Sequence, residues 1–330
     1  MNPQRINRWL EQLPPKFRHK IDQEYGTCVG VEQQAVLFED STHRIFKAFF
    51  ERNAQTLIVK ACLQQTEQVS LQSVNIGKRH FWALMNSLFA MKPCSSLAQS
   101  AAVYEWLKRH SPLQIPVFLG ACQLDDQEFM SANFQTFIVG EILQPERVTV
   151  DIMHHLANHL VSMHQHYVAG FTHFAELKHV ELVQQGEQTN SSVWFSRLSE
   201  VLEALPAELF RPYAKPNFTK LLQEMAKQQL KFVPQVIDFR WDQLMRSSQG
   251  SLFLLDLDAW VLAPVELDWV MLELVLTPEQ LALLVAAYQQ YLPVPKIAKQ
   301  RLVYRALLFA MNLLGETDWQ AWCNRPHLLD

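Results

Sequence analysis

The stretch that decides the fold is "QVIDFRWDQLM", residues 235–245, which is followed by "FLLDLDAW" at residues 253–260. Both runs are apolar in the way that buried strands are, yet together they carry four acids: Asp238, Asp242, Asp256 and Asp258. Alternate side chains of an extended chain share a side, so the two acids of each run would face the same way, with Arg240 beside the first pair. The "RSSQG" turn at 246–250 predicts a hairpin that brings the acids together.

Carboxylates that converge repel one another and are costly to bury. A divalent cation is the common remedy, and ligands that are all oxygen favour Mg²⁺, which often brings a nucleotide phosphate as a further ligand. The acids therefore indicate phosphoryl transfer. The alternative is that Asp238 and Asp242 are turn or cap residues, while Asp256 and Asp258 form structural ion pairs.

Composition describes an ordinary globular chain. It has 330 residues, of which 49 % are hydrophobic and 19 % charged, with a formal net charge of −4. The length favours one large bilobal unit or two domains, and no basic field invites nucleic acid. We expect no membrane span and no signal peptide. Five scattered cysteines without a CxxC pair predict reduced thiols and a cytoplasmic protein.

Periodicity divides the chain into a β-rich and a helical part. We expect a helix within 3–25, broken at the Pro14-Pro15 pair, and strands at 33–40, 44–51, 55–63, 116–124 and 135–143. Helical periodicity covers 77–110, 150–168, 193–205 and 216–230, and helices continue after the second acidic run to the end. The prediction is an α+β fold with a small β-rich lobe at 1–140 and a larger, mainly helical lobe at 141–330 that contains the hairpin.

The chain resembles the aminoglycoside phosphotransferase and choline-kinase-like branch of the protein-kinase-like fold, weakly and over most of its length. "LFEDSTHRIFKAFFERNAQTLIVKA" (37–61) is similar to the first three strands of that fold, with Lys60 in the position of the phosphate-binding lysine. "LAQSAAVYEWLKRHSPLQIPVFLG" (97–120) resembles the next helix and strand. "TFIVGEIL" (136–143) resembles the hinge that meets adenine, and "LANHLVSMHQH" (156–166) the long helix that follows.

The most specific similarity lies in the two acidic runs. The family carries H-G-D-x-x-x-x-N-x-L, and Val236-Ile237-Asp238 with Gln243-Leu244 fits that spacing. Asp256 fits the acid of the I-D-x-E type motif that follows. "PVELDW" (264–269) is similar to a later G-D-P-x-x-D-L segment, with Asp268 as its acid.

The resemblance implies a bilobal kinase-like fold that uses ATP or GTP with Mg²⁺ to phosphorylate a hydroxyl of a small molecule, similar to an aminoglycoside, choline or a sugar. It implies a role for seven residues: Asp238 as base, Arg240 as a contact of the transferring phosphoryl group, Gln243 and Asp256 as Mg²⁺ ligands, Lys60 as the phosphate-binding cation, and Val139 and Glu141 at the adenine hinge.

Four departures from the pattern favour a second hypothesis. Val236 replaces the motif histidine, Gln243 replaces its asparagine, and the loop "FEDSTHR" (38–44) has no glycine. Glu105 is the only acid in the helix that should pair with Lys60, about a turn too late. The alternative is a catalytically inactive, pseudokinase-like module that binds a nucleotide or a protein partner.

Other assignments of the site compete with this one. A register shifted by four residues makes Asp242 the base and Ser247 the residue on the metal side, but that frame has no amide ligand. "GFTHFAELKH" (170–179) imitates a catalytic loop in which Glu176 would replace the base.

Two further motifs have ordinary explanations. "GTCVG" (26–30) matches a thiol nucleophile elbow, but a charged segment precedes it in place of a core strand. His155 and His159 are spaced i, i+4 as a metal pair would be, in a cluster of histidines that we interpret as a solvated, partly pH-sensitive helix.

Overall fold

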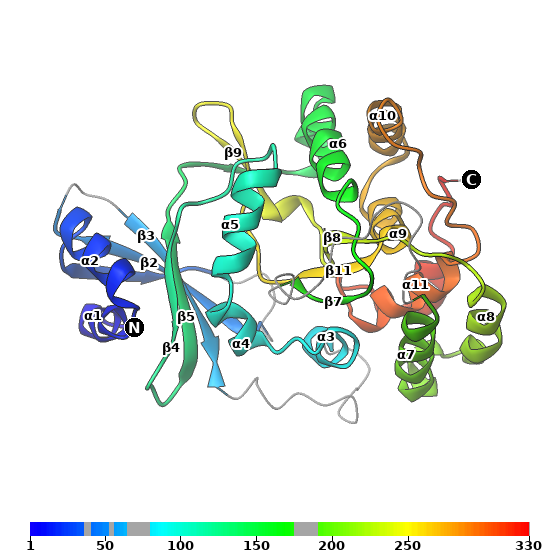
Figure 1. Ribbon diagram of the computed structural model, residues 1–330, viewed down its shortest axis with the longest axis horizontal. Helices are drawn as coiled ribbons and strands as arrows, with labels where there is room; N and C mark the ends of the chain where they lie inside the picture. The colour runs from blue at the N-terminus through cyan, green and yellow to red at the C-terminus, as the bar shows by residue number, and fades with distance from the viewer. Residues whose placement is uncertain (36–40, 53–55, 65–79, 175–190, 330) are drawn as a thin grey trace.

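The computed structural model describes residues 1–35, 41–52, 56–64, 80–174 and 191–329 (Figure 1). The predicted α+β class is confirmed, because a β-rich N-terminal sheet is followed by a mainly helical part. The sheet has the order β1-β2-β3-β5-β4, and all its pairs are antiparallel. Its strands are β1 (Cys28–Gln33), β2 (His43–Phe50), β3 (Thr56–Leu63), β4 (Phe118–Gln123) and β5 (Phe129–Thr136).

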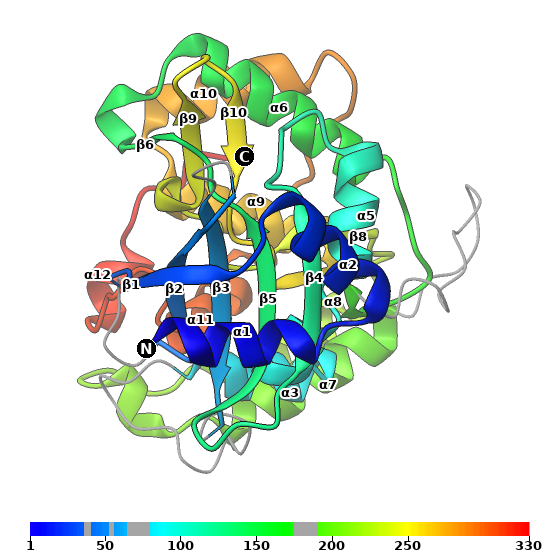
Figure 2. The same cartoon turned by 90° about the vertical axis from the view of Figure 1, so that its left-hand side faces the viewer.

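Two short helices cover the outer face of this sheet: α1 (Pro3–Glu11) and α2 (Pro15–Glu24) (Figure 2). The break between them falls at the predicted proline pair. Leu57, Val59 and Ala61 alternate along β3 and pack with Trp9 of α1 in one apolar cluster. Alternation therefore directs Lys60 and its neighbours of the same parity to the opposite, inner face.

Helices α4 (Pro93–Ala98) and α5 (Ala101–His110) cover the inner face, and they are two of the three helices found in the described part of the predicted helical segment 77–110. The third is α3 (Phe81–Phe89), and α4 contacts β3 and β5. The predicted helical segment is divided here, because Ala90 ends α3 in a left-handed conformation (φ 53°) and Pro93 begins α4.

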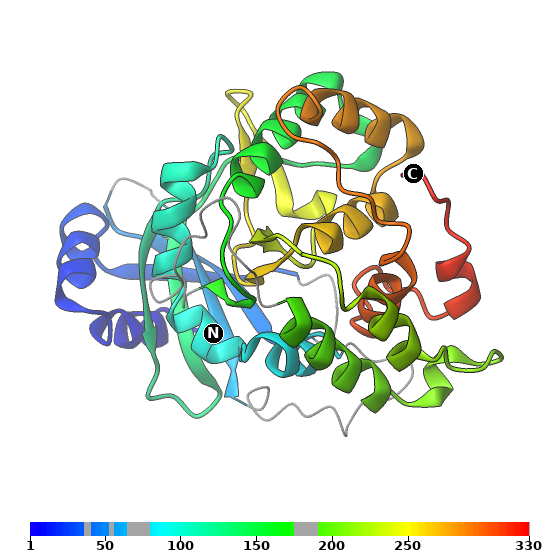
Figure 3. The same cartoon turned by 45° about the vertical axis from the view of Figure 1, so that its right-hand side comes forward.

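The helical part surrounds two three-stranded sheets with orders β10-β9-β6 and β7-β11-β8. Their strands are β6 (Gly140–Ile142), β7 (Thr172–His173), β8 (Phe232–Val236), β9 (Leu244–Ser247), β10 (Leu252–Leu254) and β11 (Trp260–Pro264). The helices are α6 (Val150–His164), α7 (Ser191–Ala204), α8 (Phe218–Met225), α9 (Val265–Val275), α10 (Pro278–Tyr288), α11 (Arg301–Ala310) and α12 (Trp319–Cys323). The green α6 and orange α10 pack side by side (Figure 3). None of the helices in the described ranges is both long and apolar enough to cross a membrane.

Two strand predictions need correction. The first strand, β1, is Cys28–Gln33, so it begins before the predicted range 33–40, of which 36–40 are outside the described residues. The predicted strand 135–143 covers only the end of β5 and all of β6, with a break between them.

The prediction of five free thiols is also wrong. Cys62 of β3 and Cys94 of α4 form a disulfide with their Cα atoms 5.2 Å apart. The other three cysteines, Cys28, Cys122 and Cys323, are free.

Candidate active site

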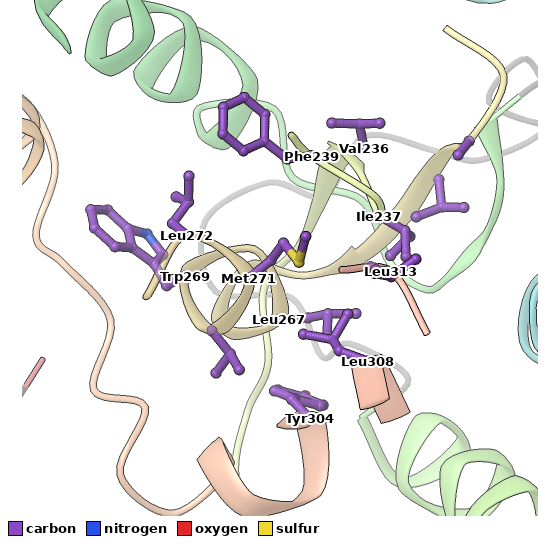
Figure 4. Packing of buried hydrophobic residues seen from close by; sticks show 14 of the residues in the cluster. Val236, Ile237, Phe239, Leu267, Trp269, Met271, Leu272, Tyr304, Leu308 and Leu313 are labelled. Carbon is purple, nitrogen blue, oxygen red and sulfur yellow. The ribbon is translucent and has the colours of Figure 1, made fainter. Parts of the chain in front are cut away.

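Asp238 projects from a turn whose two flanking residues are anchored in the core. Ile237 and Phe239 are 2 % and 4 % exposed, and Figure 4 shows them among core side chains that include Leu267 and Leu313. Strand β8 ends at Val236, before the acid, so the interpretation of 235–245 as one strand is wrong. Anchoring on both sides holds the carboxyl of Asp238 where the chain leaves the core.

Arg240 joins two of the acids that alternation predicted to face the same way. Its Nη1 donates to Asp238 Oδ2 at 3.1 Å, and its Nε donates to Asp242 Oδ1 at 2.9 Å. Burial opposes the charge of Arg240, but the two carboxylates raise the pKa of its guanidinium above its ordinary value. The side chain of Asp242 is 38 % exposed, whereas that of Asp238 is 9 % exposed, so Asp238 is the acid better shielded from water.

Unpartnered polar atoms lie beside this pair. Asp238 Oδ1 is buried and has no hydrogen-bond partner among the described residues, and the same holds for both amide atoms of Gln243. Buried polar atoms are nearly always paired with protein, water or a ligand. Asp238 and Gln243 therefore present oxygens that none of the described residues pairs with.

Lys60 connects the N-terminal sheet to the second acidic run. Its Nζ donates to Asp256 Oδ1 at 2.8 Å and also contacts Asp258 Oδ2. The side chain of Lys60 is 12 % exposed, that of Asp256 32 % and that of Asp258 5 %. Lys60 and Asp256 are 196 positions apart in the sequence. Their ion pair therefore links the N-terminal sheet to the helical part of the fold.

The shared ammonium affects the two acids differently. Burial opposes ionisation of Asp256, but the charge of Lys60 holds the pKa of that carboxyl below its ordinary range. Burial raises the pKa of Asp258 to about 6, and although Lys60 opposes this rise, the charge of Asp256 adds to it. Lys60 is also affected, because the two carboxylates outweigh its burial and raise its pKa above the ordinary value.

Sequence reasoning did not assign three residues that surround Lys60: Asp258, His43 and Tyr104. His43 Nδ1 lies 3.8 Å from Asp258 Oδ2, and burial together with Lys60 lowers the pKa of His43 to about 3, so its imidazole is neutral. Tyr104 donates a hydrogen bond to Gln135, and burial raises the pKa of its phenol. The D-x-D spacing of the second run was the only sequence signal for Asp258.

Of the predicted hinge residues, Val139 lies between β5 and β6 and Glu141 lies in β6. Val139 is 66 % exposed, and Glu141 is an exposed residue that accepts a hydrogen bond from Arg147 at 2.8 Å. Gly140 between them pairs with Ser247 of β9, and a Cβ on this glycine would lie 2.4 Å from a backbone oxygen. The close approach of β6 and β9 therefore requires glycine at this position.

The other predicted positions lie outside the cluster formed by Lys60 and the acids. Asp268 is buried in α9, and its Oδ2 lies 3.0 Å from His164 Nε2. Glu105 is exposed on α5. Glu176 is outside the described residues. Cys28 begins strand β1 after a helix, which is the reverse of a nucleophile elbow.

The histidine-rich helix is only partly solvated, contrary to the prediction. His155 is exposed and lies 3.6 Å from Asp151, whereas His159 is buried and its Nδ1 lies 2.9 Å from Ser111 Oγ. These two histidines therefore occupy different environments. Within the described ranges, no three His, Cys, Asp or Glu side chains are grouped so that they could hold a metal ion.

The donors expected for Mg²⁺ fit that ion in chemistry. Gln243 Oε1 is a buried oxygen without a partner in the described part of the chain, and the charge of Lys60 lowers the pKa of the Asp256 carboxyl. Oxygen donors of this kind suit Mg²⁺, which keeps several ligands from water or phosphate.

Comparison with solved structures shows that the chain shares its fold with proteins described as kinases and phosphotransferases. A putative fructosamine-3-kinase from Haemophilus somnus 129PT has a TM-score of 0.54 at 11 % identity, with 92 % of each chain covered. ADP-bound aminoglycoside phosphotransferase APH(2'')-Ib has a TM-score of 0.53 at 12 % identity, with 94 % of each covered. Choline kinase LicA from Streptococcus pneumoniae has a TM-score of 0.50 at 15 % identity, with 93 % of each covered. No family model and no curated protein matches the sequence.

Proposed function

We propose that the chain is a phosphotransferase that moves the γ-phosphoryl group of ATP or GTP to a hydroxyl of a small molecule. The observation that carries the proposal is the meeting of Lys60 with Asp256 and Asp258, next to a loop where Asp238 and Gln243 present unpartnered oxygens. Cations and oxygen donors held at one point are what phosphoryl transfer requires, because catalysis depends on positioning and on neutralising phosphate charge.

In this mechanism Asp238 accepts the proton of the attacking hydroxyl. Arg240 occupies its Oδ2, so Oδ1 is the atom left to accept that proton. The guanidinium of Arg240 also lies beside the acid where the transferring group would pass and would neutralise its charge. Lys60 would bind nucleotide phosphates, and the segment that contains Val139 and Glu141 would contact the base.

Gln243 and Asp256 would hold Mg²⁺, and the ion would neutralise the phosphate oxygens as charge develops on them. Asp256 is suited to this role because Lys60 keeps it ionised and its side chain is the more exposed of the two Lys60 partners. Gln243 contributes a neutral carbonyl oxygen from a buried position.

A test of catalysis compares the wild type with Asp238→Asn. Purified protein is given ATP or GTP with Mg²⁺ and a panel of aminoglycosides, macrolides, choline and fructosamine, and transfer of labelled phosphate is measured. Loss of a general base lowers turnover by about 10² to 10⁴-fold. The melting temperature should stay nearly unchanged, since asparagine can still accept a hydrogen bond from Arg240. Full activity in the variant would remove Asp238 from the mechanism.

The second candidate function is a non-catalytic module that binds a nucleotide or a protein partner. The observation that favours it is the pairing of Lys60 with two carboxylates, which must be loosened before phosphate can take their place. The two functions separate in a melting experiment with ATP or GTP, with and without Mg²⁺. A ligand at a hundred times its Kd stabilises the folded state by about 2.7 kcal/mol. Binding without transfer to any acceptor supports the module.

A further inference from the structure

The two acids that contact Lys60 differ in depth. The side chain of Asp258 is 5 % exposed and that of Asp256 is 32 % exposed. A buried ammonium is stable only with a counter-charge beside it, and removing that counter-charge is strongly destabilising. Asp256 is accessible enough to exchange Lys60 for a ligand that arrives from solvent. Asp258 is too deeply buried to bind such a ligand unless the side chains that cover it move.

The charges around the two acids also differ. The positive charges of Lys60 and Arg240 both lower the pKa of Asp256. Asp258 has Lys60 and His43 as its ion-pair partners within the described ranges, and burial keeps His43 neutral. His43 is itself held in place, because its ring packs edge-on against Trp82 with centroids 5.8 Å apart. Lys60 is therefore the charged partner of Asp258 among the described residues.

The helices over the inner face of the sheet offer no substitute for Asp258. The only acid in α4 and α5 is Glu105, and its side chain is exposed. Tyr104, which precedes it, is buried and donates its hydroxyl hydrogen to Gln135. The counter-charge that orients Lys60 therefore comes from the loop between β10 and β11, and not from these helices.

We propose that Asp258 is the positioning residue of Lys60: it holds the ammonium in the site while Asp256 is released to the metal. This inference rests on the proposed function and adds a division of labour between two acids that are two residues apart. When nucleotide and metal arrive, Asp256 would exchange its contact with Lys60 for the cation. Lys60 would remain bound to Asp258 and meet the phosphates in a fixed orientation.

The first experiment compares Asp258→Asn with Asp256→Asn in nucleotide binding and turnover, with and without Mg²⁺. Misplacing a positioning group can lower the rate by about 10²-fold. We expect Asp258→Asn to raise KM for the nucleotide and lower kcat by about that factor, while binding still depends on Mg²⁺. Asp256→Asn should remove the dependence on Mg²⁺. If Asp258→Asn also removes that dependence, Asp258 is a metal ligand and the inference is overturned. Unchanged KM and kcat would overturn it as well.

The second experiment needs no nucleotide, so it separates failure of this inference from failure of the proposed function. Acetic anhydride acetylates neutral amines, and the rate at Lys60 can be followed by mass spectrometry of the peptide that contains it. Because Asp258 anchors the ammonium at a largely buried position, Asp258→Asn should free the side chain and speed acetylation of Lys60 several-fold. The matched control is Glu203→Gln, since Glu203 lies 3.8 Å from another partly buried lysine, Lys215. It should leave the rate at Lys60 unchanged. An unchanged rate in Asp258→Asn would refute the inference.

Two further variants keep the test decisive if Asp258→Asn folds poorly. Asp258→Glu retains the charge and should restore part of the nucleotide affinity. A cycle that combines Asp258→Asn with Lys60→Met measures whether the acid acts through the lysine. The double variant should then bind nucleotide as weakly as Lys60→Met alone. Additive losses would show that Asp258 acts on something other than Lys60.

Discussion

Glu266 offers a direct test of the electrostatics of the helical part. It lies in the first turn of α9, and its Oε2 is buried without a hydrogen-bond partner in the described part of the chain. Burial raises the pKa of this carboxyl from 4.5 to about 7, although its own backbone N–H and the charge of Lys231 oppose the rise. The folded state therefore favours the protonated acid. Its contribution to stability is full below pH 4.5 and is lost as the pH rises through about 7.

The magnitude follows from the difference between these values. A rise of about 2.5 pKa units corresponds to about 3 kcal/mol of the free energy of unfolding, at about 1.4 kcal/mol per unit. Glu266→Gln removes the ionisation and keeps the shape of the side chain. At pH 8.5 the variant should be more stable than the wild type by up to about 3 kcal/mol, or about 5 °C in melting temperature. At pH 5 the two proteins should melt nearly together.

The assay is thermal and urea unfolding of both proteins at the two pH values in buffers of equal ionic strength. Glu279→Gln is the matched control, because Glu279 occupies the same position in the first turn of α10 and is exposed. Its effect should be small and nearly independent of pH. If Glu266→Gln has the same effect at pH 5 and pH 8.5, burial of this carboxyl does not govern its titration and the reasoning is refuted.

Three further outcomes can be checked by unfolding and binding measurements. The buried carboxylate of Glu273 accepts a hydrogen bond from Arg301 Nε at 2.9 Å, and Arg301→Met removes that cation. Urea unfolding should show a loss of about 3 kcal/mol in the free energy of unfolding. Arg5→Ala removes the cation that holds the pKa of Asp126 below its ordinary range despite the burial of that carboxyl. The stability that this ion pair provides is present above pH 3.8 and is lost as the pH falls below that value. The melting temperatures of wild type and variant should therefore converge at acid pH. Gly140→Ala should lower the melting temperature and weaken nucleotide binding measured by titration, because its Cβ would lie 2.4 Å from the opposite backbone oxygen; unchanged values would show that β6 and β9 separate freely.

The sequence predicted the parts of the fold whose periodicity is regular. Strands β2 and β3 alternate strongly: β3 lies within its predicted range, and β2 (His43–Phe50) overlaps all of the predicted range 44–51 except its last residue. Strand β5 was misplaced because its inner face carries Ser131, Asn133 and Gln135, so its apolar alternation is interrupted by buried polar residues. Burial of this kind depends on neighbours that are distant in sequence, and a local pattern does not encode it.

The candidate site was predictable in its members more than in its connections. Asp238, Gln243 and Asp256 were assigned from their resemblance to the family's motifs, and their roles stay predictions. The pairing of Lys60 with both acids of the D-x-D run did not follow, because it depends on how the sheet and the helical part meet. Asp258 was visible in the sequence, but only its depth beneath Asp256 distinguishes the two acids.

The small sheet β10-β9-β6 has a mechanical consequence. Strand β9 begins immediately after Gln243, β10 ends two residues before Asp256, and β6 belongs to the segment that leaves the N-terminal sheet. The segment that connects the two parts of the molecule therefore pairs, through β6, with the β9–β10 hairpin, which is flanked by both proposed metal ligands. If the N-terminal sheet rotated, β6 would transmit the movement to the β9–β10 hairpin, and the two proposed ligands, Gln243 and Asp256, would move together. We therefore expect the spacing between the two proposed ligands to be kept whenever the N-terminal sheet shifts relative to the helical part.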